Sequence, residues 1–197
     1  MGSPFLAIFD GLFDDALCLS IGGGPRRDHI MLTNLNIGPY PNVDICADAH
    51  LLPYTNESVD AIYCDATLEH LKDPHQAVRE MYRVLKKGRK IYVSTPFLQA
   101  FHGYPHHYQN YTLTGHKYLF EINGFKSLEV GTAVGPTYTI VSLISTFIAE
   151  YSPALLQKLF RIAWGLAGAF IRPLDIILAK RENAYIMAST TYILAVK

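Results

Sequence analysis

The stretch CLSIGGGPRRDHIMLTNLNI, residues 18–37, places three consecutive glycines between two apolar runs. After the first strand of an open parallel sheet, a glycine turn lets a ligand approach the backbone, because no side chain covers the N–H groups. The dinucleotide pattern GxGxxG is excluded, because Arg27 stands where its third glycine would be. The stretch alone predicts a ligand-binding turn, and a purely structural tight turn is the alternative.

Composition limits the classes of protein to consider. The chain has 197 residues, 50% of them apolar, which is enough for one domain with a sizeable core. Its 17 basic and 17 acidic residues give no overall field that would attract nucleic acid. Cys18, Cys46 and Cys64 form no CxxC pair, so we expect buried free thiols in a reducing compartment. Without a secretory signal pattern, the expected location is cytoplasmic.

The first two thirds of the chain alternate strand-like runs with turns and helices, which is the α/β pattern. Continuously apolar runs such as VDICA and DAIYC predict a parallel sheet covered on both faces. One helix is predicted to begin at Pro74 after the capping residue Asp73 and to stop at Gly88, and a second to cover 112–122. Strands are predicted at 17–21, 30–36, 43–47, 60–64, 90–95 and 125–131, with one more at the end of the chain.

Three further motifs follow the glycine turn beside predicted strands. They read ADAHLLPY at 47–54, DAIYCDATLEHLKDP at 60–74 and RVLKKGRKIYVSTPF at 83–97. In order and spacing they resemble class I S-adenosylmethionine-dependent methyltransferases, specifically a small type 11-like group reading glycine turn, D-A-x-x-L-P-F, L-E-H and R-V-L-K-P-G-G. The resemblance covers 17–135. It implies a single α/β domain over 1–197, with a Rossmann-like, mostly parallel seven-stranded sheet, helices on both faces and an antiparallel last strand.

The resemblance also implies that S-adenosylmethionine lies across the carboxyl ends of the strands. Ser20 replaces the acid that usually receives the cofactor's ammonium group, and Asn36 replaces the acid that holds the ribose hydroxyls, which removes a charge-assisted hydrogen bond. These departures leave a second hypothesis open, a non-catalytic cofactor-binding or scaffold protein derived from the family. By position, the implied cofactor-binding residues are Gly22, Gly23, Gly24, Asn36, Asp48, Ala49, Cys64 and Asp65.

The connection after the glycine turn is unusually short. Only residues 25–29 separate Gly24 from the next predicted strand, whereas a parallel crossover normally takes a dozen or more residues. The first helix of the fold is therefore expected to be shortened. The sheet face that it leaves bare needs another cover, either FLAIFDGLF at 5–13 or a neighbouring subunit.

The stretch FLQAFHGYPHHYQNYT, residues 97–112, follows the fifth predicted strand and, by the resemblance, lies over the transferred methyl group. Histidine is the side chain best suited to take up a proton near neutral pH. The general base is expected at His102 or His106, with His107 next and the tyrosines of the loop shaping the pocket. Glu69 and His70, by the resemblance, mainly organise their own loop. The predicted reaction is methyl transfer to a hydroxyl or amine of a small or lipid-linked acceptor.

A metal site is the alternative interpretation of the same loop. Its three histidines could form a ligand set together with Asp65. Gly103 and Pro105 exclude a regular HxxxH helix, however, so we expect no metal.

Residues 137–180 lie outside the resemblance and are predicted to form an apolar helical insertion. TYTIVSLISTFIA is short, and ALLQKLFRIAWGLAGAFI carries Lys158 and Arg161, so no transmembrane helix is expected. A helix of this composition must bury most of its circumference. It could do so in the domain core or in a homodimer interface, either of which we expect over peripheral contact with a membrane; a lid over the pocket is the remaining alternative.

Overall fold

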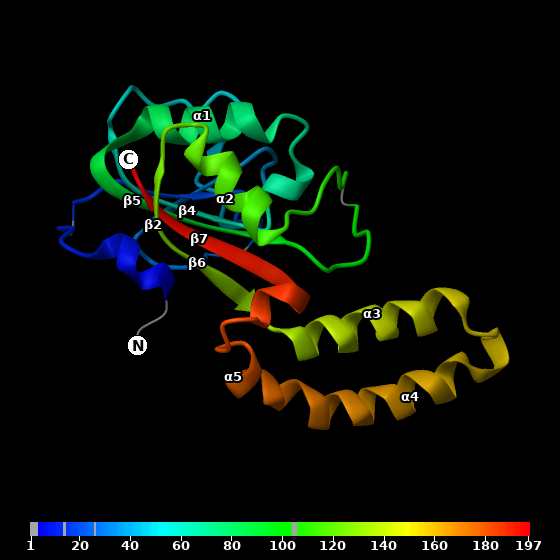
Figure 1. Ribbon diagram of the computed structural model, residues 1–197. Helices are drawn as coiled ribbons and strands as arrows, with labels where there is room; N and C mark the ends of the chain where they lie inside the picture. Colours follow the sequence, from blue (N-terminus) through cyan, green and yellow to red (C-terminus); the bar gives the residue numbers. More distant parts are fainter. Residues whose placement is uncertain (1–3, 14, 26, 104–105) are drawn as a thin grey trace.

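The computed structural model describes residues 4–13, 15–25, 27–103 and 106–197, which build one seven-stranded sheet with helices packed on it (Figure 1). The strand order is β3-β2-β1-β4-β5-β7-β6, and β7 alone runs antiparallel to its neighbours. This confirms the fold class that the resemblance implied. The strands are β1 (Cys18–Ile21), β2 (Leu32–Asn36), β3 (Ile45–Cys46), β4 (Val59–Asp65), β5 (Leu85–Pro96), β6 (Lys126–Val134) and β7 (Thr190–Val196).

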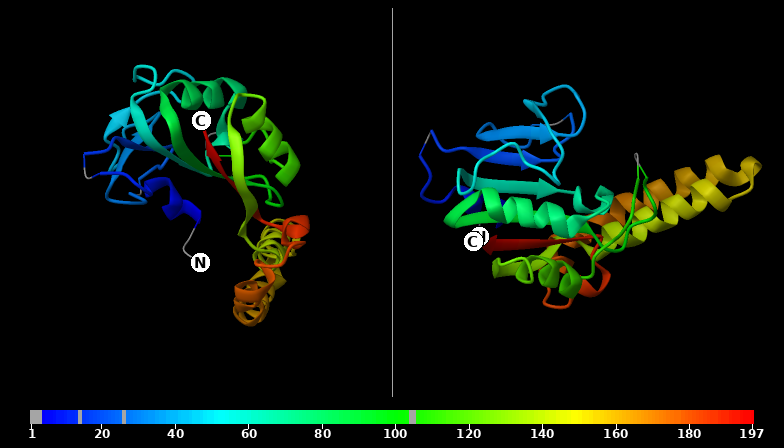
Figure 2. Two further views of the ribbon diagram at one scale, coloured as in Figure 1. Left: turned by 60° about the vertical axis from the view of Figure 1, so that its left-hand side comes forward. Right: turned by 90° about the horizontal axis from the view of Figure 1, so that it is seen from above.

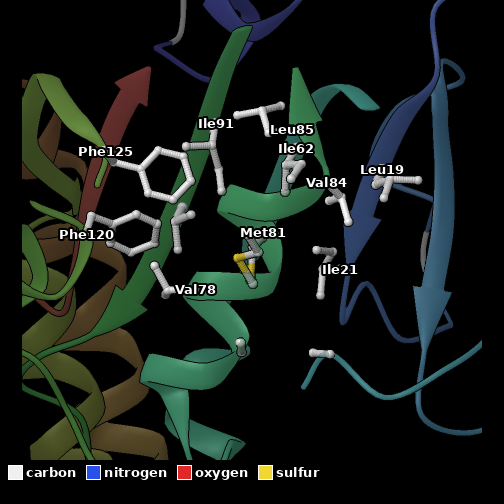
Figure 3. Close-up of a cluster of buried hydrophobic side chains, with 14 of the residues drawn as sticks. Leu19, Ile21, Ile62, Val78, Met81, Val84, Leu85, Ile91, Phe120 and Phe125 are labelled. Carbon is white, nitrogen blue, oxygen red and sulfur yellow. The ribbon is translucent and has the colours of Figure 1, made fainter. Parts of the chain in front are cut away.

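One face of the sheet is covered by α1 (Pro74–Val84) and α2 (Leu113–Glu121). Both begin where the sequence predicts, because side-chain oxygens of Asp73 and Thr112 accept hydrogen bonds from the first free backbone N–H groups. The apolar stripe of α1 then lies against the sheet, and this packing forms the main core. Figure 3 shows side chains of this core, among them Val78, Met81, Val84, Ile62 and Ile91.

The end of α1 differs from the prediction, which placed the stop at Gly88. The helix ends at Val84, and Leu85 already pairs with Val59 of β4. Gly88 lies within β5 at a φ of 73°, where the register between β4 and β5 shifts. The glycine therefore permits a bulge near the start of β5 and does not end the helix.

The opposite face of the sheet is covered by the short 3-10 helix η1 (Pro4–Phe9). The described residues between β1 and β2, 22–25 and 27–31, contain turns and no helix. Ile8 is 2% exposed and packs in a second cluster with side chains of β1, β4, β5 and β7. The N-terminal segment thus supplies the cover that the sequence predicted for this face.

A helical hairpin is inserted between β6 and β7 and projects from the sheet, as Figure 2 shows most clearly in its right-hand view. The outgoing arm packs against the returning arm along its length. The hairpin consists of α3 (Pro136–Tyr151), α4 (Ala154–Ile171), η3 (Arg172–Leu174) and α5 (Asp175–Leu178), and η4 (Ala184–Met187) leads into β7.

Asp175 closes the base of this hairpin. Its carboxylate oxygens accept hydrogen bonds from the backbone N–H groups of Thr137 (3.0 Å) and Tyr138 (3.0 Å) in the first turn of α3. A negative charge is favourable at a helix N-terminus. Because these residues belong to opposite arms, the contact holds the arms together beside the sheet.

The sequence predicts that this region holds no helix able to span a membrane. This prediction is wrong, because one helix is long and apolar enough to do so. Among the described residues, one helical run, Ala154–Leu178, qualifies, with 25 residues, a mean hydropathy of 1.3 and 6% of its apolar window buried. The apolar segment on which the prediction was based ends at Ile171. The run continues because Pro173 falls in the first turn of η3, where proline is tolerated, and the apolar DIIL segment follows.

The cover on the second face can be tested with two substitutions in η1. We expect Ile8→Ala to lower the free energy of unfolding by about 2–5 kcal/mol, because it removes a buried side chain and leaves a cavity. Leu6→Ala is the matched control, since Leu6 in the same helix is 47% exposed and should cost far less. Urea denaturation followed by circular dichroism measures both. An equal loss of unfolding free energy in the two variants would contradict a packing role for Ile8.

Candidate functional site

A cavity of about 580 Å³ lies at the carboxyl ends of β1, β2 and β4. This volume falls within the roughly 300–1,000 Å³ of small-molecule sites. Open parallel sheets bind ligands at this edge, outside the strand ends. The lining comprises Ile21, Gly22, Gly24, Pro25, Leu35, Asn36, Ile37, Tyr40, Ala47, Asp48, Ala49, His50, Ala66, Thr67, His70, Leu71, Lys72 and Tyr108.

The glycine turn forms one wall of the cavity. Gly22 adopts a φ of 80°, and its N–H donates a hydrogen bond to the carbonyl of Leu35 (2.8 Å). A Cβ on Gly22 would lie 2.1 Å from Oγ1 of Thr67, so the position accepts only glycine. Gly24 also lines the cavity at a positive φ, whereas Gly23 does not line it and sits against side chains of β1 and β2.

Asp48 and Ala49 lie on the lining, as the resemblance implied for the region beside the adenine. The Asp48 carboxylate accepts hydrogen bonds from the backbone N–H of His50 (2.9 Å) and from Nδ1 of its ring (2.6 Å). Nε2 of that ring accepts from the N–H of Asp73, which leaves the ring proton on Nδ1. These bonds, the backbone one foremost, hold the pKa of Asp48 below its usual value, so it presents a charged edge to the cavity.

The two positions that depart from the family pattern lie at the same strand ends. Asn36 lines the cavity, where its amide replaces the expected acid. Ser20 is buried, and its hydroxyl donates a hydrogen bond to the Asp28 carboxylate (3.2 Å). An acid is therefore present beside the turn, supplied from a different position. Asp28 could not be identified as this acid from the sequence pattern, which places the acid directly before the glycines.

Cys64 and Asp65 are not on this cavity. Cys64 is completely buried in the main core, where burial raises the pKa of its thiol, so it cannot border a ligand in the cavity. Asp65 accepts a hydrogen bond from the Ser94 hydroxyl and lines a second cavity of about 340 Å³. Ala66, at a φ of 47°, lines both cavities. All three cysteines are free, but Cys46 is exposed, because β3 is an edge strand.

None of the three histidines proposed as a base lines the large cavity in the described part of the chain. From their loop Tyr108 does so, and the imidazoles on the cavity wall are those of His50 and His70, which come from other segments. The rings of His102 and His107 pack against His70, with centroids 5.5 and 6.1 Å away. His106 contributes its carbonyl, which accepts a hydrogen bond from Nδ1 of His70 (2.5 Å). Tyr104 and Pro105 lie outside the described residues.

Glu69 lies behind His70 and is completely buried. Burial raises the pKa of its carboxyl to about 8. Burial also lowers the pKa of His70, which favours its neutral ring. The sequence analysis gave both residues a role in organising the loop, and the Tyr108 N–H does donate to the Glu69 carbonyl (2.8 Å). Their convergence with His102 could not be predicted, because it depends on the path of 97–112.

Comparison with known proteins agrees with this geometry. Residues 30–93 match the family described as "Methyltransferase domain". A ubiquinone/menaquinone biosynthesis C-methyltransferase of Enterobacter sp. is 39% identical over 59 residues, which is 29% of this chain and 24% of that protein. A methyltransferase from Thermotoga maritima dependent on S-adenosylmethionine superposes with a TM-score of 0.62 at 17% identity, covering 98% of this chain and 87% of that chain.

A phosphoethanolamine N-methyltransferase of Haemonchus contortus, bound to phosphomonomethylethanolamine and S-adenosylhomocysteine, has a TM-score of 0.55 at 17% identity, covering 98% of this chain and 52% of that one. At this identity the likeness concerns the fold. The fold, the match of residues 30–93 to the methyltransferase family and the short relative together support a resemblance to the class I S-adenosylmethionine-dependent methyltransferases. The cavity fits the cofactor of that class, because it combines a bare glycine turn with a carboxylate and an amide at neighbouring strand ends.

The glycine turn gives a direct test of the cofactor site. We expect Gly22→Ala to weaken binding of S-adenosylhomocysteine at least about tenfold, because the new methyl meets Thr67 and alanine is strained at this φ by about 1–3 kcal/mol. The matched control is Gly11→Ala, since Gly11 has a similar φ of 70° with no heavy atom within 4 Å of the added Cβ. Calorimetric titration measures the affinity, and equal affinity in wild type and Gly22→Ala would remove the turn from the site.

Proposed function

We propose that this chain transfers the methyl group of S-adenosylmethionine to a hydroxyl or amine of a lipid-linked acceptor at a membrane surface. The cofactor supplies an electrophilic methyl group, so the chain has chiefly to hold and align the acceptor. One observation carries the lipid part of the proposal: the hairpin of α3 and α4 holds uncharged polar groups between its helices and exposes many large apolar side chains.

Two uncharged polar groups of α4 bond to α3. The indole N–H of Trp164 donates a hydrogen bond to the Val141 carbonyl (3.0 Å), and the Gln157 amide donates to the Ala149 carbonyl (2.5 Å). Arg161 borders a space beside Ser145 and Thr146 of α3, among others, but it is exposed, as is Lys158. The contact between the helices therefore contains polar groups, whereas a helix pair packed for water buries its apolar side there.

The contact between the helices also has the composition of helix pairs in lipid. Gly168 lies against Val141, and Gly165 borders the space beside Arg161. Small residues let helix backbones approach closely where no hydrophobic force drives association. The hydroxyls of Ser145 and Thr146 donate to carbonyls one turn earlier in α3, so they need no water.

The outward surface of the hairpin is apolar on both arms. Such a surface exceeds the scattered apolar residues of an ordinary soluble monomer. An interfacial bilayer region accepts apolar side chains around a helix pair, while a second copy of the chain would cover one side of it. The most exposed apolar side chains are Phe147, Tyr151, Leu155, Leu159, Ile162, Leu166, Phe170, Ile176 and Ile177.

The hairpin stands at the edge of the sheet that carries the site. Thr190, at the start of β7, pairs with Pro96 at the end of β5 and with Val134 at the end of β6. The second cavity lies here, lined by Val134 and Thr190 on the hairpin side and by Asp65 and Ala66 on the β4 side. Since Ala66 also lines the cofactor cavity, this second cavity is our candidate chamber for the acceptor group.

The comparisons bear on the acceptor only through the names of two proteins. The Enterobacter relative is named for ubiquinone and menaquinone biosynthesis, which supports a lipid acceptor, but as a C-methyltransferase it transfers the methyl group to carbon and not to a hydroxyl or amine. The Haemonchus structure holds phosphomonomethylethanolamine, which is an amine. The relative is matched over about a quarter of its length, so the acceptor rests on the hairpin and the chamber.

Flotation with liposomes tests the membrane contact. We expect the wild type to float with phosphatidylcholine vesicles, and more strongly when phosphatidylserine is added, because Lys158, Arg161 and Arg172 outnumber the acids of the hairpin. Phe170→Glu should lower the partition coefficient at least about tenfold, since it removes an apolar side chain worth roughly 1.5–3 kcal/mol. Ile30→Glu is the matched control, because Ile30 is 87% exposed and Phe170 82%, but Ile30 lies outside the hairpin.

Light scattering on the same proteins separates the remaining interpretations. A wild type that stays unbound and is dimeric, and that becomes monomeric with Phe170→Glu, would replace the membrane by a homodimer interface. A monomer that ignores vesicles would leave the hairpin as a lid.

Methyl transfer itself can be followed with S-adenosylmethionine labelled on its methyl group and a lipid extract of the source cells. We expect label in the organic phase, and at least about tenfold less with Ala133→Trp, which fills the second cavity but leaves the cofactor cavity intact. Binding of S-adenosylhomocysteine to this variant should equal that of wild type. Cofactor binding without transfer to lipid or small-molecule acceptors would favour the scaffold alternative.

A further inference from the structure

The cofactor site does not explain why the Glu69 carboxylate is buried. This side chain is completely buried, and among the described residues neither of its oxygens has a hydrogen-bond partner. The basic side chains near it in this part of the chain are histidines, and no lysine or arginine reaches it. Burying a carboxylate without donors is costly, which is why burial raises its pKa, so as an anion this side chain needs a partner that the described donors do not provide.

Two imidazoles face this carboxylate through the same ring atom. Nε2 of His70 lies 3.8 Å and Nε2 of His102 lies 3.9 Å from Oε1 of Glu69. Their Nδ1 atoms are engaged elsewhere, on the carbonyls of His106 (2.5 Å) and Ala100 (2.9 Å). A carbonyl only accepts, so each Nδ1 carries a ring proton, and in the neutral form of each ring Nε2 presents a lone pair toward Glu69.

Three acceptors therefore converge on one point, and we propose that Glu69, His70 and His102 bind a divalent cation of the zinc class. Two imidazoles and one carboxylate form a familiar donor set for zinc, with at least one coordination position left for an exchangeable ligand. Ring N–H groups held on backbone carbonyls are the usual outer support of metal-binding histidines. Glu69 is the unpartnered group that the cation satisfies.

The distances suit a site that closes on its ion. The three ligand atoms lie within 4.8 Å of one another, whereas bonds of about 2.1 Å in tetrahedral geometry place them roughly 3.4 Å apart. The widest pair must therefore close by up to about 1.4 Å. His102, in the loop after β5, is the ligand that can supply it, because it is partly exposed while Glu69 is enclosed.

His107 supports the site without belonging to it. Its Nδ1 accepts a hydrogen bond from the His102 N–H (3.2 Å), so its Nε2 carries the proton and donates to Asn110 (2.6 Å). Both ring nitrogens are thus occupied. The ring packs against His102 with centroids 4.2 Å apart and fixes its orientation.

The place of the cation has a consequence for the reaction, which rests on the proposed function although the binding itself does not. His70 lines the cofactor cavity, so the ion would stand at its wall. A cation lowers the pKa of a hydroxyl that coordinates it. For a hydroxyl acceptor that reaches the ion from the second cavity past Ala66, which lines both cavities, the ion would ease the loss of the proton, a task that the sequence predicts for a histidine base.

Zinc titration tests the proposal without cofactor or acceptor. The full chain, untagged and treated with a chelator, is titrated with zinc chloride in a calorimeter. We expect one ion per chain, and at least about a hundredfold weaker binding in Glu69→Gln and in His102→Ala, because each removes a ligand. His106→Ala is the matched control, since this residue contributes only its backbone carbonyl, and it should bind like the wild type.

Thermal unfolding shows whether each variant is folded, so that lost zinc binding can be told from lost folding. Zinc should raise the Tm of wild type and His106→Ala and leave that of His102→Ala, whose ring is partly exposed, unchanged. No stoichiometric binding by the wild type would overturn the proposal. Equal affinity in all four proteins would also overturn it, because binding would then come from exposed histidines elsewhere.

Discussion

The backbone turn at Gly22 is the constraint on which the rest of the site depends. Its N–H donates to the Leu35 carbonyl at the end of β2, and the Thr67 hydroxyl donates to the Ile21 carbonyl at the end of β1 (3.1 Å). Thr67 occupies the volume that any Cβ on Gly22 would need. Because no side chain stands there, the ends of β1 and β2 and the segment after β4 meet at one point. This meeting point is the floor of the cofactor cavity.

Features that depend on one special residue type were predictable from the sequence. The glycine turn and the Asp73 cap each act through local backbone geometry, so β1 ends and α1 begins where predicted. Gly88 carries an equally strong local signal but was misread. Glycine marks a positive φ and not a helix end as such, and pairing of Leu85 with β4 had already ended the helix.

The cofactor site was predictable only in part. Asn36 and Asp48 reach the cavity because they follow strands that end at the same edge of the sheet. Cys64 was wrongly included, although side chains alternate along a strand and Cys64 shares the core face of β4 with Ile62. The contact of His70 with His102 joins segments far apart in the sequence, and no local signal encodes the path between them.

The strand order places the hairpin and the site at the same edge of the sheet. β6 runs parallel to β5, and β7 returns antiparallel between them, so a segment inserted between β6 and β7 leaves and re-enters the sheet where β5 ends. An apolar insertion at the opposite edge would stand far from the glycine turn. Here it stands beside the second cavity, and a bilayer that covered the hairpin would bring its headgroups to the strand ends. The apolar surface and the second cavity, which look unrelated in the sequence, therefore lie at the same edge of the sheet.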